Sequence, residues 1–313
     1  MIEGSERGGA KRSSREDPEK ARTNAKVNLF LRVIGSRPDG YHEIETIFHG
    51  VGLADDLTIA PTDTGRIEVN MQLLEGLTGD IPPLEENLVW RAADRLVTLG
   101  AVNPGVRIDI LKRIPMAAGL GGGSGNAAGV LALLNEIWSA GHDGPALLGL
   151  AGDLGSDVPY CTGGGTVLAT GRGEKLTRIP APQDMWFVLG ITAKPLATRD
   201  VYERWDAIRV PNGLGSAPLV LALGEGDVFE VARLLHNDLE DAAFSMMPEL
   251  RAKKQAVVDA GALGAALSGS GPTLYGVASD EDHAVRIAAR VEPLFDRTLV
   301  VNSRPTCLER LDS

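Results

Sequence analysis

The sequence predicts an α+β fold in two domains. The chain has 313 residues, of which 43% are hydrophobic, and on size grounds this length favours two cores over one. Short runs with apolar residues at every second position alternate with stretches of helical spacing, and no motif repeats at a fixed period. We place the domains at residues 23–180 and 181–313, with a Pro-containing linker at 179–184. Residues 1–22 have almost nothing to bury and are expected to form a disordered leader.

The elements are predicted in chain order from their spacing. The first strand covers residues 26–34, and the turn SRPDG at 36–40 ends it. Asn87 begins a helix, and residues 115–138 form a glycine-rich loop that runs into a strongly apolar helix. The other expected strands are 57–60, 67–71, 106–110, 186–192, 265–268 and 298–301, and the other expected helices are 248–260 and 281–291.

Composition disfavours several classes of partner. The net charge is −11 and no long basic stripe is present, which disfavours nucleic acids and anionic membranes. No apolar run is long enough to span a bilayer. The two cysteines, Cys161 and Cys307, are far apart in sequence and lack CxxC spacing, so neither a disulfide framework nor a zinc site is supported. These features predict a cytoplasmic protein, a monomer or a weak homodimer.

The glycine-rich loop is the strongest local signal for a ligand. Its glycines leave several backbone N–H groups free to approach a phosphate, and the next helix adds its positive end. A flexible linker is the alternative, but Ser124 and Asn126 within the run favour a binding site. The loop lacks the lysine of a Walker motif, and Ser124 stands where a dinucleotide loop has glycine.

Three segments in order resemble the motifs of the GHMP kinases: AKVNLFL at 25–31, PMAAGLGGGSGNAAG at 115–129 and LSGSGPT at 267–273. Segments 39–57, 86–92 and 155–160 are similar to those members that act on a cytidine-diphosphate-linked sugar alcohol. The resemblance implies a ribosomal-protein-S5-like N-terminal domain and a ferredoxin-like C-terminal domain, with a cleft between them. It further implies phosphorylation, with ATP and Mg²⁺, of the 2-hydroxyl of 4-diphosphocytidyl-2-C-methyl-D-erythritol for non-mevalonate isoprenoid (terpenoid) synthesis.

The resemblance implies two catalytic residues. Asp157 would act as the base that takes the proton of the attacking hydroxyl. Lys26, on the first strand, would be the partner of that aspartate. Each has a structural alternative, since Asp157 also suits a helix or turn cap and Lys26 also suits a solvated strand edge.

The expected ATP site combines the loop with two flanking polar residues. Asn87 is similar to the family asparagine that lies beside adenine, and it also suits a helix N-cap. Lys112 would either reach the nucleotide phosphates or lie on its strand without a binding role. Ser124 is a candidate ligand of Mg²⁺, with an N-cap as the alternative. The ATP-binding residues expected from the loop itself are Pro115, Ala117, Ala118, Gly119, Leu120, Gly121, Gly122, Gly123, Ser124, Gly125 and Asn126.

The expected acceptor site depends on the resemblance. Tyr41 and His42 match residues that pack on and hydrogen-bond cytosine, and Tyr202 would cover the other side of that base. Asn28 projects to the same side as Lys26, and Thr198 shares a face with Tyr202 if that stretch is helical. Gly269 and Gly271 of the third motif are also expected to close on the substrate.

Two departures and two rival interpretations stay open. The chain has Asn24 where the family usually has proline, and Gly125 where a second small Ser or Ala is usual. Another GHMP kinase, acting on mevalonate, phosphomevalonate, homoserine or a sugar, is the first alternative. A non-catalytic sensor with the same fold is the second, although such a protein is expected to have replaced Lys26 or Asp157.

Overall fold

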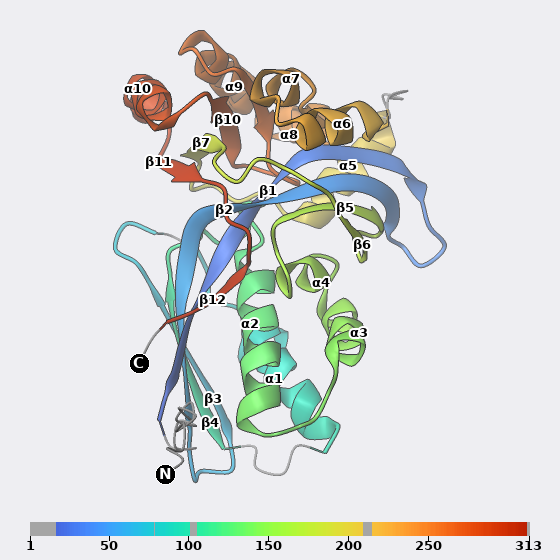
Figure 1. Ribbon diagram of the computed structural model, residues 1–313, viewed down its shortest axis with the longest axis vertical. Helices are drawn as coiled ribbons and strands as arrows, with labels where there is room; N and C mark the ends of the chain where they lie inside the picture. Colours follow the sequence, from blue (N-terminus) through green and yellow to red (C-terminus); the bar gives the residue numbers. More distant parts are fainter. Residues whose placement is uncertain (1–16, 78, 101–104, 209–214, 312–313) are drawn as a thin grey trace, which may run out of the picture.

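The computed structural model describes residues 17–77, 79–100, 105–208 and 215–311. Two β-sheets, each covered by helices, form two lobes (Figure 1). We use N-lobe for the first sheet with α1–α4 and C-lobe for the second sheet with α5–α10. The α+β class predicted from the sequence is confirmed.

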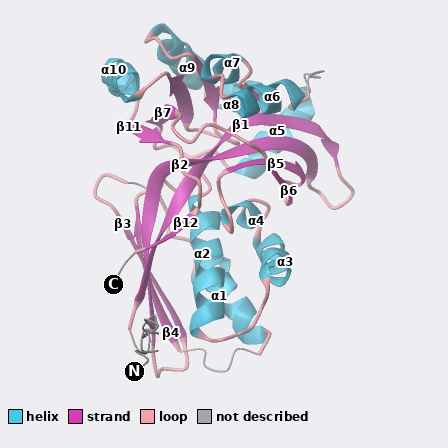
Figure 2. Cartoon of the chain, in the orientation of Figure 1, coloured by secondary structure: helices cyan, strands magenta, loops and turns pink. Residues whose placement is uncertain are grey.

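The N-lobe sheet is antiparallel except for two parallel pairs, β3 with β4 and β1 with β8. Figure 2 shows the helices of this lobe gathered on one face of the sheet. Its main strand order is β12 (Leu308–Arg310), β1 (Glu19–Ser36), β2 (His42–Pro61), β4 (Val106–Lys112) and β3 (Ile67–Leu73), with β5 (Thr166–Gly171) joined to β2 and β6 (Lys175–Arg178), and β8 (His236–Asn237) joined to β1. Its helices are η1 (Leu84–Glu86), α1 (Leu88–Thr98), α2 (Gly122–Ile137), α3 (Gly144–Leu154) and α4 (Val158–Cys161).

The C-lobe sheet is antiparallel throughout its described strands. Its strand order is β11 (Arg297–Asn302), β7 (Trp186–Ile191), β10 (Leu274–Ala278) and β9 (Gly264–Leu267). Its helices are α5 (Thr198–Ile208), α6 (Ala217–Glu225), α7 (Val228–Arg233), α8 (Glu240–Met246), α9 (Glu249–Asp259), α10 (Glu281–Val291) and η2 (Glu292–Leu294). None of the described helices is long and apolar enough to cross a membrane.

The predicted strands and helices all occur, but two strands extend far beyond the predicted ranges. β1 and β2 form a long hairpin that crosses from one lobe to the other (Figure 1). The alternation of apolar residues does not show how far β1 extends, because Thr23–Leu31 are buried at every position, polar residues included. Val27 and Leu29 pack into an apolar core, while Lys26 and Asn28 face a cavity on the other side.

The proposed domain limits differ from the observed sheets at both ends. β1 begins at Glu19, so the last residues of the predicted leader lie in a strand; residues 1–16 lie outside the described residues. β8 and β12 come from the predicted C-terminal domain yet pair with β1. Both cover hydrogen-bonding groups along β1, so the chain returns to the N-lobe sheet after residue 180.

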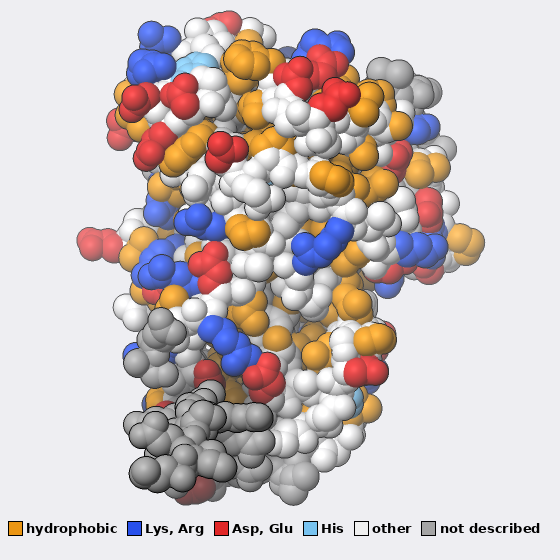
Figure 3. All heavy atoms as spheres, viewed as in Figure 1, with side chains coloured by type: hydrophobic (Ala, Val, Ile, Leu, Met, Phe, Trp, Pro, Cys, Tyr) orange, Lys and Arg blue, Asp and Glu red, His pale blue; other side chains and the backbone are white. Residues whose placement is uncertain are grey.

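An apolar core joins the two lobes. Val27 and Leu29 of β1 belong to the same cluster as Phe187 of β7 and Tyr275 of β10, and all four are fully buried. Burial on this scale resists separation of the lobes, since each large apolar side chain contributes about 1.5–3 kcal/mol. The surface is mixed in charge, and Figure 3 shows acidic and basic side chains interspersed on one face.

The two cysteines, distant in sequence, meet in the fold. Cys161 of α4 and Cys307 are both buried free thiols. A hydrogen bond between them, reinforced by burial, raises the pKa of the Cys161 thiol well above its usual value. The Cys161 thiol therefore stays protonated, and both buried side chains pack as small apolar groups.

Candidate active site

A cavity of about 980 Å³ lies where β1, β2, the glycine loop, α5 and the third motif meet. It has the size of a small-molecule site. It brings together most of the residues expected from the sequence, from segments more than 200 residues apart along the chain. The predicted residues that line it are Lys26, Asn28, Tyr41, His42, Asn87, Lys112, Pro115, Ala117, Ala118, Gly119, Leu120, Gly121, Gly122, Gly123, Ser124, Asn126, Asp157, Thr198, Tyr202 and Gly269.

Lys26 and Asp157 form an ion pair on the cavity wall. Nζ of Lys26 lies 3.3 Å from Oδ2 of Asp157, with the lysine side chain 4% exposed and the aspartate 34% exposed. Asp157 occupies the N-cap position of α4, but its side chain makes no capping hydrogen bond. The carboxylate is therefore free of a structural capping role and open to the cavity.

Lys26 is held from behind by polar and aromatic groups. Its Nζ donates to Oδ1 of Asn28 at 2.8 Å and lies 5.1 Å from the centre of the Phe48 ring. Asn28 in turn donates to Thr46, whose hydroxyl donates to the Phe30 carbonyl. The solvated strand-edge interpretation of Lys26 is wrong, because the ammonium is buried and fixed in one place.

The glycine loop ends at the N-terminus of α2, as predicted. Gly121 is the N-cap residue with φ of 72°, a left-handed conformation that glycine adopts without strain. The first helical hydrogen bond joins Gly125 N to Gly121 O. The amides of Gly122, Gly123 and Ser124 thus have no partner within the helix. All three residues line the cavity, and this positive end of the helix favours an anion there.

The third motif closes against this loop. Oγ of Ser268 donates to the Gly119 carbonyl at 2.9 Å. The two backbones approach so closely that a Cβ on Gly119 would lie 2.0 Å from the Ser268 carbonyl oxygen. Gly269 lies beside β1, since a Cβ on this glycine would be 3.3 Å from Oδ1 of Asn28 and 3.4 Å from Nζ of Lys26. Gly119 has no room for a side chain, and Gly269 has a positive φ of 56°, a backbone conformation that other residues rarely adopt.

A buried carboxylate that sequence reasoning missed fixes the loop from behind. Asp55 of β2 is fully buried. Its Oδ1 accepts hydrogen bonds from the amides of Arg113 and Ile114 at 2.7 and 2.8 Å, and its Oδ2 accepts from Lys112 Nζ and, at 3.0 Å, from Asn126 Nδ2. Asp55 therefore ties the residues just before the loop to the helix just after it.

The structure bears on the alternative roles left open for three residues of the expected ATP site. Asn87 is the N-cap of α1, where its Oδ1 accepts from Val89 N at 2.9 Å, and it also lines the cavity. Lys112 is buried and donates to Asp55 and Asn126, so it is not a surface lysine of its strand. Ser124 is not the N-cap of α2, because Gly121 holds that position.

Aromatic and charged side chains line the other end of the cavity. The rings of His42 and Tyr202 lie 4.7 Å apart, and Arg172 lies 4.6 Å from the centre of the Tyr41 ring. Nε2 of His42 lies 3.1 Å from Oδ2 of Asp206, a residue of α5. Burial raises the pKa of the Tyr202 phenol well above its usual value, so that hydroxyl stays protonated. Arg172 and Asp206 were not expected from the sequence, because no local pattern marks them.

Three further expected residues have other positions or partners. Thr198 does share the cavity face of α5 with Tyr202, and its hydroxyl bonds to Ser270 at 2.9 Å. Gly125 and Gly271 do not line the cavity. Gly125 faces Thr23 and Cys307 on the buried side of α2, and Gly271 faces the Leu267 side chain.

Comparisons with known proteins assign this architecture to a family. Residues 87–165 match the GHMP kinases N terminal domain, and residues 219–295 match the GHMP kinases C terminal domain. A 4-diphosphocytidyl-2-C-methyl-D-erythritol kinase of Pelotomaculum thermopropionicum is 41% identical over 283 residues, which cover 90% of this chain and 97% of the relative. The chain belongs to this kinase family. The two-domain GHMP kinase fold expected from the three motifs is confirmed.

Solved structures agree with this assignment. The crystal structure of a 4-(cytidine 5'-diphospho)-2C-methyl-D-erythritol kinase has a TM-score of 0.74 and 33% identity, and the match covers 91% of this chain and 98% of that one. A homoserine kinase from Cytophaga hutchinsonii has a TM-score of 0.76 at only 20% identity, with coverage of 97% and 100%. That second likeness shows the fold alone. The chain is thus an ATP-dependent kinase with a small-molecule acceptor.

Proposed function

We propose that this kinase transfers the γ-phosphate of ATP to the 2-hydroxyl of 4-diphosphocytidyl-2-C-methyl-D-erythritol. The observation that carries the proposal is the ion pair of Lys26 and Asp157, which lines one cavity together with the glycine loop and an aromatic pocket. The acceptor is the one for which the related kinases are named. The cavity offers what such a reaction needs, namely glycine-loop amides for phosphates, a carboxylate for a base, and aromatic rings for a nucleobase.

Asp157 is the residue suited to take the proton of the attacking hydroxyl. Its carboxylate is partly exposed to the cavity and carries no capping hydrogen bond. Lys26 holds the carboxylate in place, and its second contact with Asn28 fixes the ammonium. A general base positioned in this way contributes about 10²–10⁴-fold to a rate.

The loop and the start of α2 are suited to hold the phosphates of ATP. The amides of Gly122, Gly123 and Ser124, which have no partner within the helix, supply donors without side-chain charge. The Ser124 hydroxyl fits Mg²⁺, a cation that prefers oxygen ligands and shares its shell with phosphates and water. When bound, Mg²⁺ would neutralise charge on the transferred group.

The far end of the cavity is suited to a cytidine diphosphate group. Tyr41 and Tyr202 offer ring faces for a base, with gains of about 1–3 kcal/mol per stacked contact. His42, held by Asp206, adds a polar group beside them. Arg172 brings a cation to the same wall, which suits the negative charge of a diphosphate.

The test is ADP release by the purified protein with Mg-ATP and each of four acceptors: the cytidine-linked methylerythritol, mevalonate, homoserine and galactose. We expect turnover with the first acceptor only. Asp157→Asn should lower kcat at least about 100-fold, because the base is lost while the shape of the side chain is kept. Asp153→Asn, an exposed aspartate of α3 that pairs with Arg95, should match the wild type.

Two outcomes would contradict the proposal. Turnover with another acceptor would support kinase activity but contradict the assignment of the pocket formed by Tyr41, His42 and Tyr202 to cytidine. Binding of ATP without turnover of any acceptor would favour the sensor interpretation instead.

A further inference from the structure

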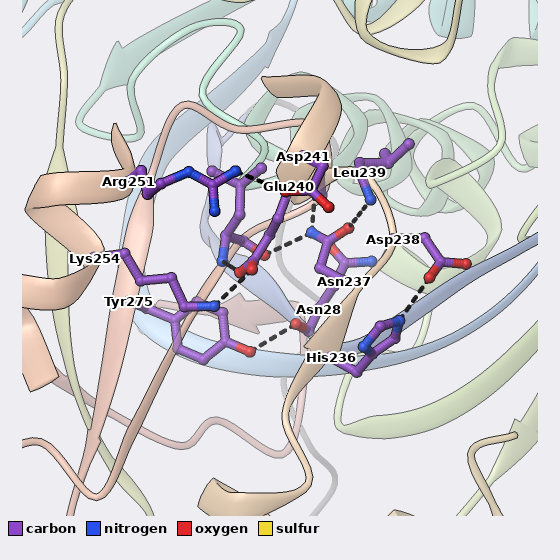
Figure 4. Close-up of polar contacts among 12 residues, drawn as sticks. Asn28, His236, Asn237, Asp238, Leu239, Glu240, Asp241, Arg251, Lys254 and Tyr275 are labelled. Atoms are coloured by element: carbon purple, nitrogen blue, oxygen red, sulfur yellow. Dashed lines mark hydrogen bonds and ion pairs between the residues drawn. The ribbon is translucent and has the colours of Figure 1, made fainter. Parts of the chain in front are cut away.

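The segment between α7 and α8 connects the two sheets close to the site, although no motif assigned it a role. His236 and Asn237 form β8 and pair in parallel with Phe30 and Leu31 of β1. Figure 4 shows Asn237 at the centre of the polar contacts around this segment, with dashed lines joining its amide to neighbouring backbone groups. The segment therefore lies between the strand that carries Lys26 and the third motif.

The Asn237 amide bonds to backbone groups through both of its N–H donors and through its oxygen. Its Nδ2 donates to the Leu267 and Gly269 carbonyls, both at 2.8 Å, and its Oδ1 accepts from Leu239 N at 2.9 Å. The residue is 4% exposed. The two carbonyls flank Ser268, so the amide fixes the backbone on both sides of the first residue of the SGSG turn.

That turn touches both halves of the reaction site. Ser268 bonds to the Gly119 carbonyl of the phosphate loop, and Gly269 lies against Lys26 and Asn28. Two further hydrogen bonds hold the turn and β1 in place (Figure 4). Glu240 accepts from Leu267 N at 3.0 Å, and the Tyr275 hydroxyl donates to the Asn28 carbonyl at 2.7 Å. A shift of the turn would therefore move the phosphate loop and the surroundings of Lys26 together.

We propose that Asn237 is a positioning residue, which sets the SGSG turn so that the glycine loop keeps its phosphate-binding shape. It touches neither substrate nor reacting atoms and acts through Ser268 and Gly269. The inference depends on the kinase using ATP but not on the identity of the acceptor. Because about 1 Å of misplacement costs up to ~10²-fold in rate, one amide at this place has a large effect on function.

The test is isothermal titration of ADP into the full-length Asn237→Asp variant. A carboxylate has the same size but loses both donors and faces two carbonyl oxygens. We expect the Kd for ADP to rise about tenfold or more, and kcat with the acceptor that the wild type uses to fall. The matched control is Asn135→Asp, since the Asn135 amide likewise bonds to backbone groups, the N–H and carbonyl of His142 at 3.0 Å, at the far end of α2.

The melting temperatures of both variants separate positioning from stability. The proposal stands if the two variants lose a similar amount of melting temperature but only Asn237→Asp binds ADP more weakly than the wild type does. Equal and unchanged Kd values in both variants would overturn it.

A second variant covers the case in which Asn237→Asp does not fold. Ser268→Ala removes only the hydrogen bond to Gly119 and should weaken ADP binding in the same direction, by a smaller factor. Unchanged binding in Ser268→Ala would overturn the link between the turn and the loop. Because ADP binding is measured without any acceptor, an error in the proposed acceptor leaves this test intact.

Discussion

At the level of single residues, buried polar side chains hold the active site in place. Asp55 accepts four hydrogen bonds, and Lys112 and Asn126 bond to it and to each other. A buried charge is stable only when it is paired and hydrogen-bonded. Asp55 and Lys112 meet this condition, since both are at most 2% exposed and form an ion pair.

Asp55→Asn should therefore be strongly destabilising. It leaves the Lys112 ammonium buried without its counter-charge, and loss of one partner of a buried pair costs about 3–5 kcal/mol. We expect a fall of that size in the free energy of unfolding measured with urea, and a partial recovery in Asp55→Asn/Lys112→Met, which removes both charges.

Asp56→Asn is the control for this prediction. Asp56 is the next residue on β2, but its carboxylate is 30% exposed and pairs with Arg22 and Arg113 near the surface. Its replacement should cost less than about 1 kcal/mol. Similar losses in the two single variants would mean that Asp55 is not held as described.

At the level of elements, α2 connects the phosphate loop to the N-lobe core. The helix carries glycines at positions 125 and 129 on buried faces, and neither has a positive φ. Glycine within a helix is about 1 kcal/mol less favourable than alanine. The space around each glycine decides whether that cost can be removed.

Gly125→Ala and Gly129→Ala should change stability in opposite directions. A Cβ at Gly125 would meet Cys307 Sγ and Thr23 Cβ at 3.5 Å, an ordinary contact, so alanine should raise the free energy of unfolding by about 1 kcal/mol. A Cβ at Gly129 would lie 2.9 Å from Thr23 Cγ2 and 3.2 Å from Leu57 Cδ2, so alanine should lower it by about 1–3 kcal/mol. Urea unfolding of both variants checks the signs, and equal signs would contradict the packing.

At the level of the whole molecule, contacts between segments far apart along the chain hold the structure together. His49 of β2 is buried between Thr166 of β5 and Ser303, with each ring nitrogen 2.8 Å from a hydroxyl. Burial lowers the pKa of His49 from 6.5 to about 4. The imidazole is therefore neutral in the folded protein at pH values where it would be charged in the unfolded chain.

This difference predicts a loss of stability in weak acid. Between pH 6.5 and about 4 the unfolded chain binds a proton at His49 that the folded protein does not. The stabilisation is thus complete above pH 6.5 and is lost as the pH falls, by roughly 3 kcal/mol in total. His49→Gln should show a shallower decline than the wild type over this range in urea unfolding, and parallel curves would contradict the assignment.

The sequence by itself determined the parts of the site that are contiguous along the chain. The glycine run and α2 are adjacent, so one segment reveals both the phosphate loop and the helix that supplies its amides. Asn87 caps the helix that follows it, and the strand pattern placed Lys26 and Asn28 on one side of β1. Such features depend on local dihedral angles and on side-chain periodicity, both of which the sequence shows directly.

Only the tertiary structure decided which distant residues meet. Asp55 lies 57 positions before Lys112, and Asn237 lies 32 positions before Gly269 and far beyond β1, with which it pairs. β12 likewise returns to β1 from the end of the chain. A carboxylate or an amide carries no local sign of its future partner, because a hydrogen bond between distant segments exists only after both backbones have been folded around a common core.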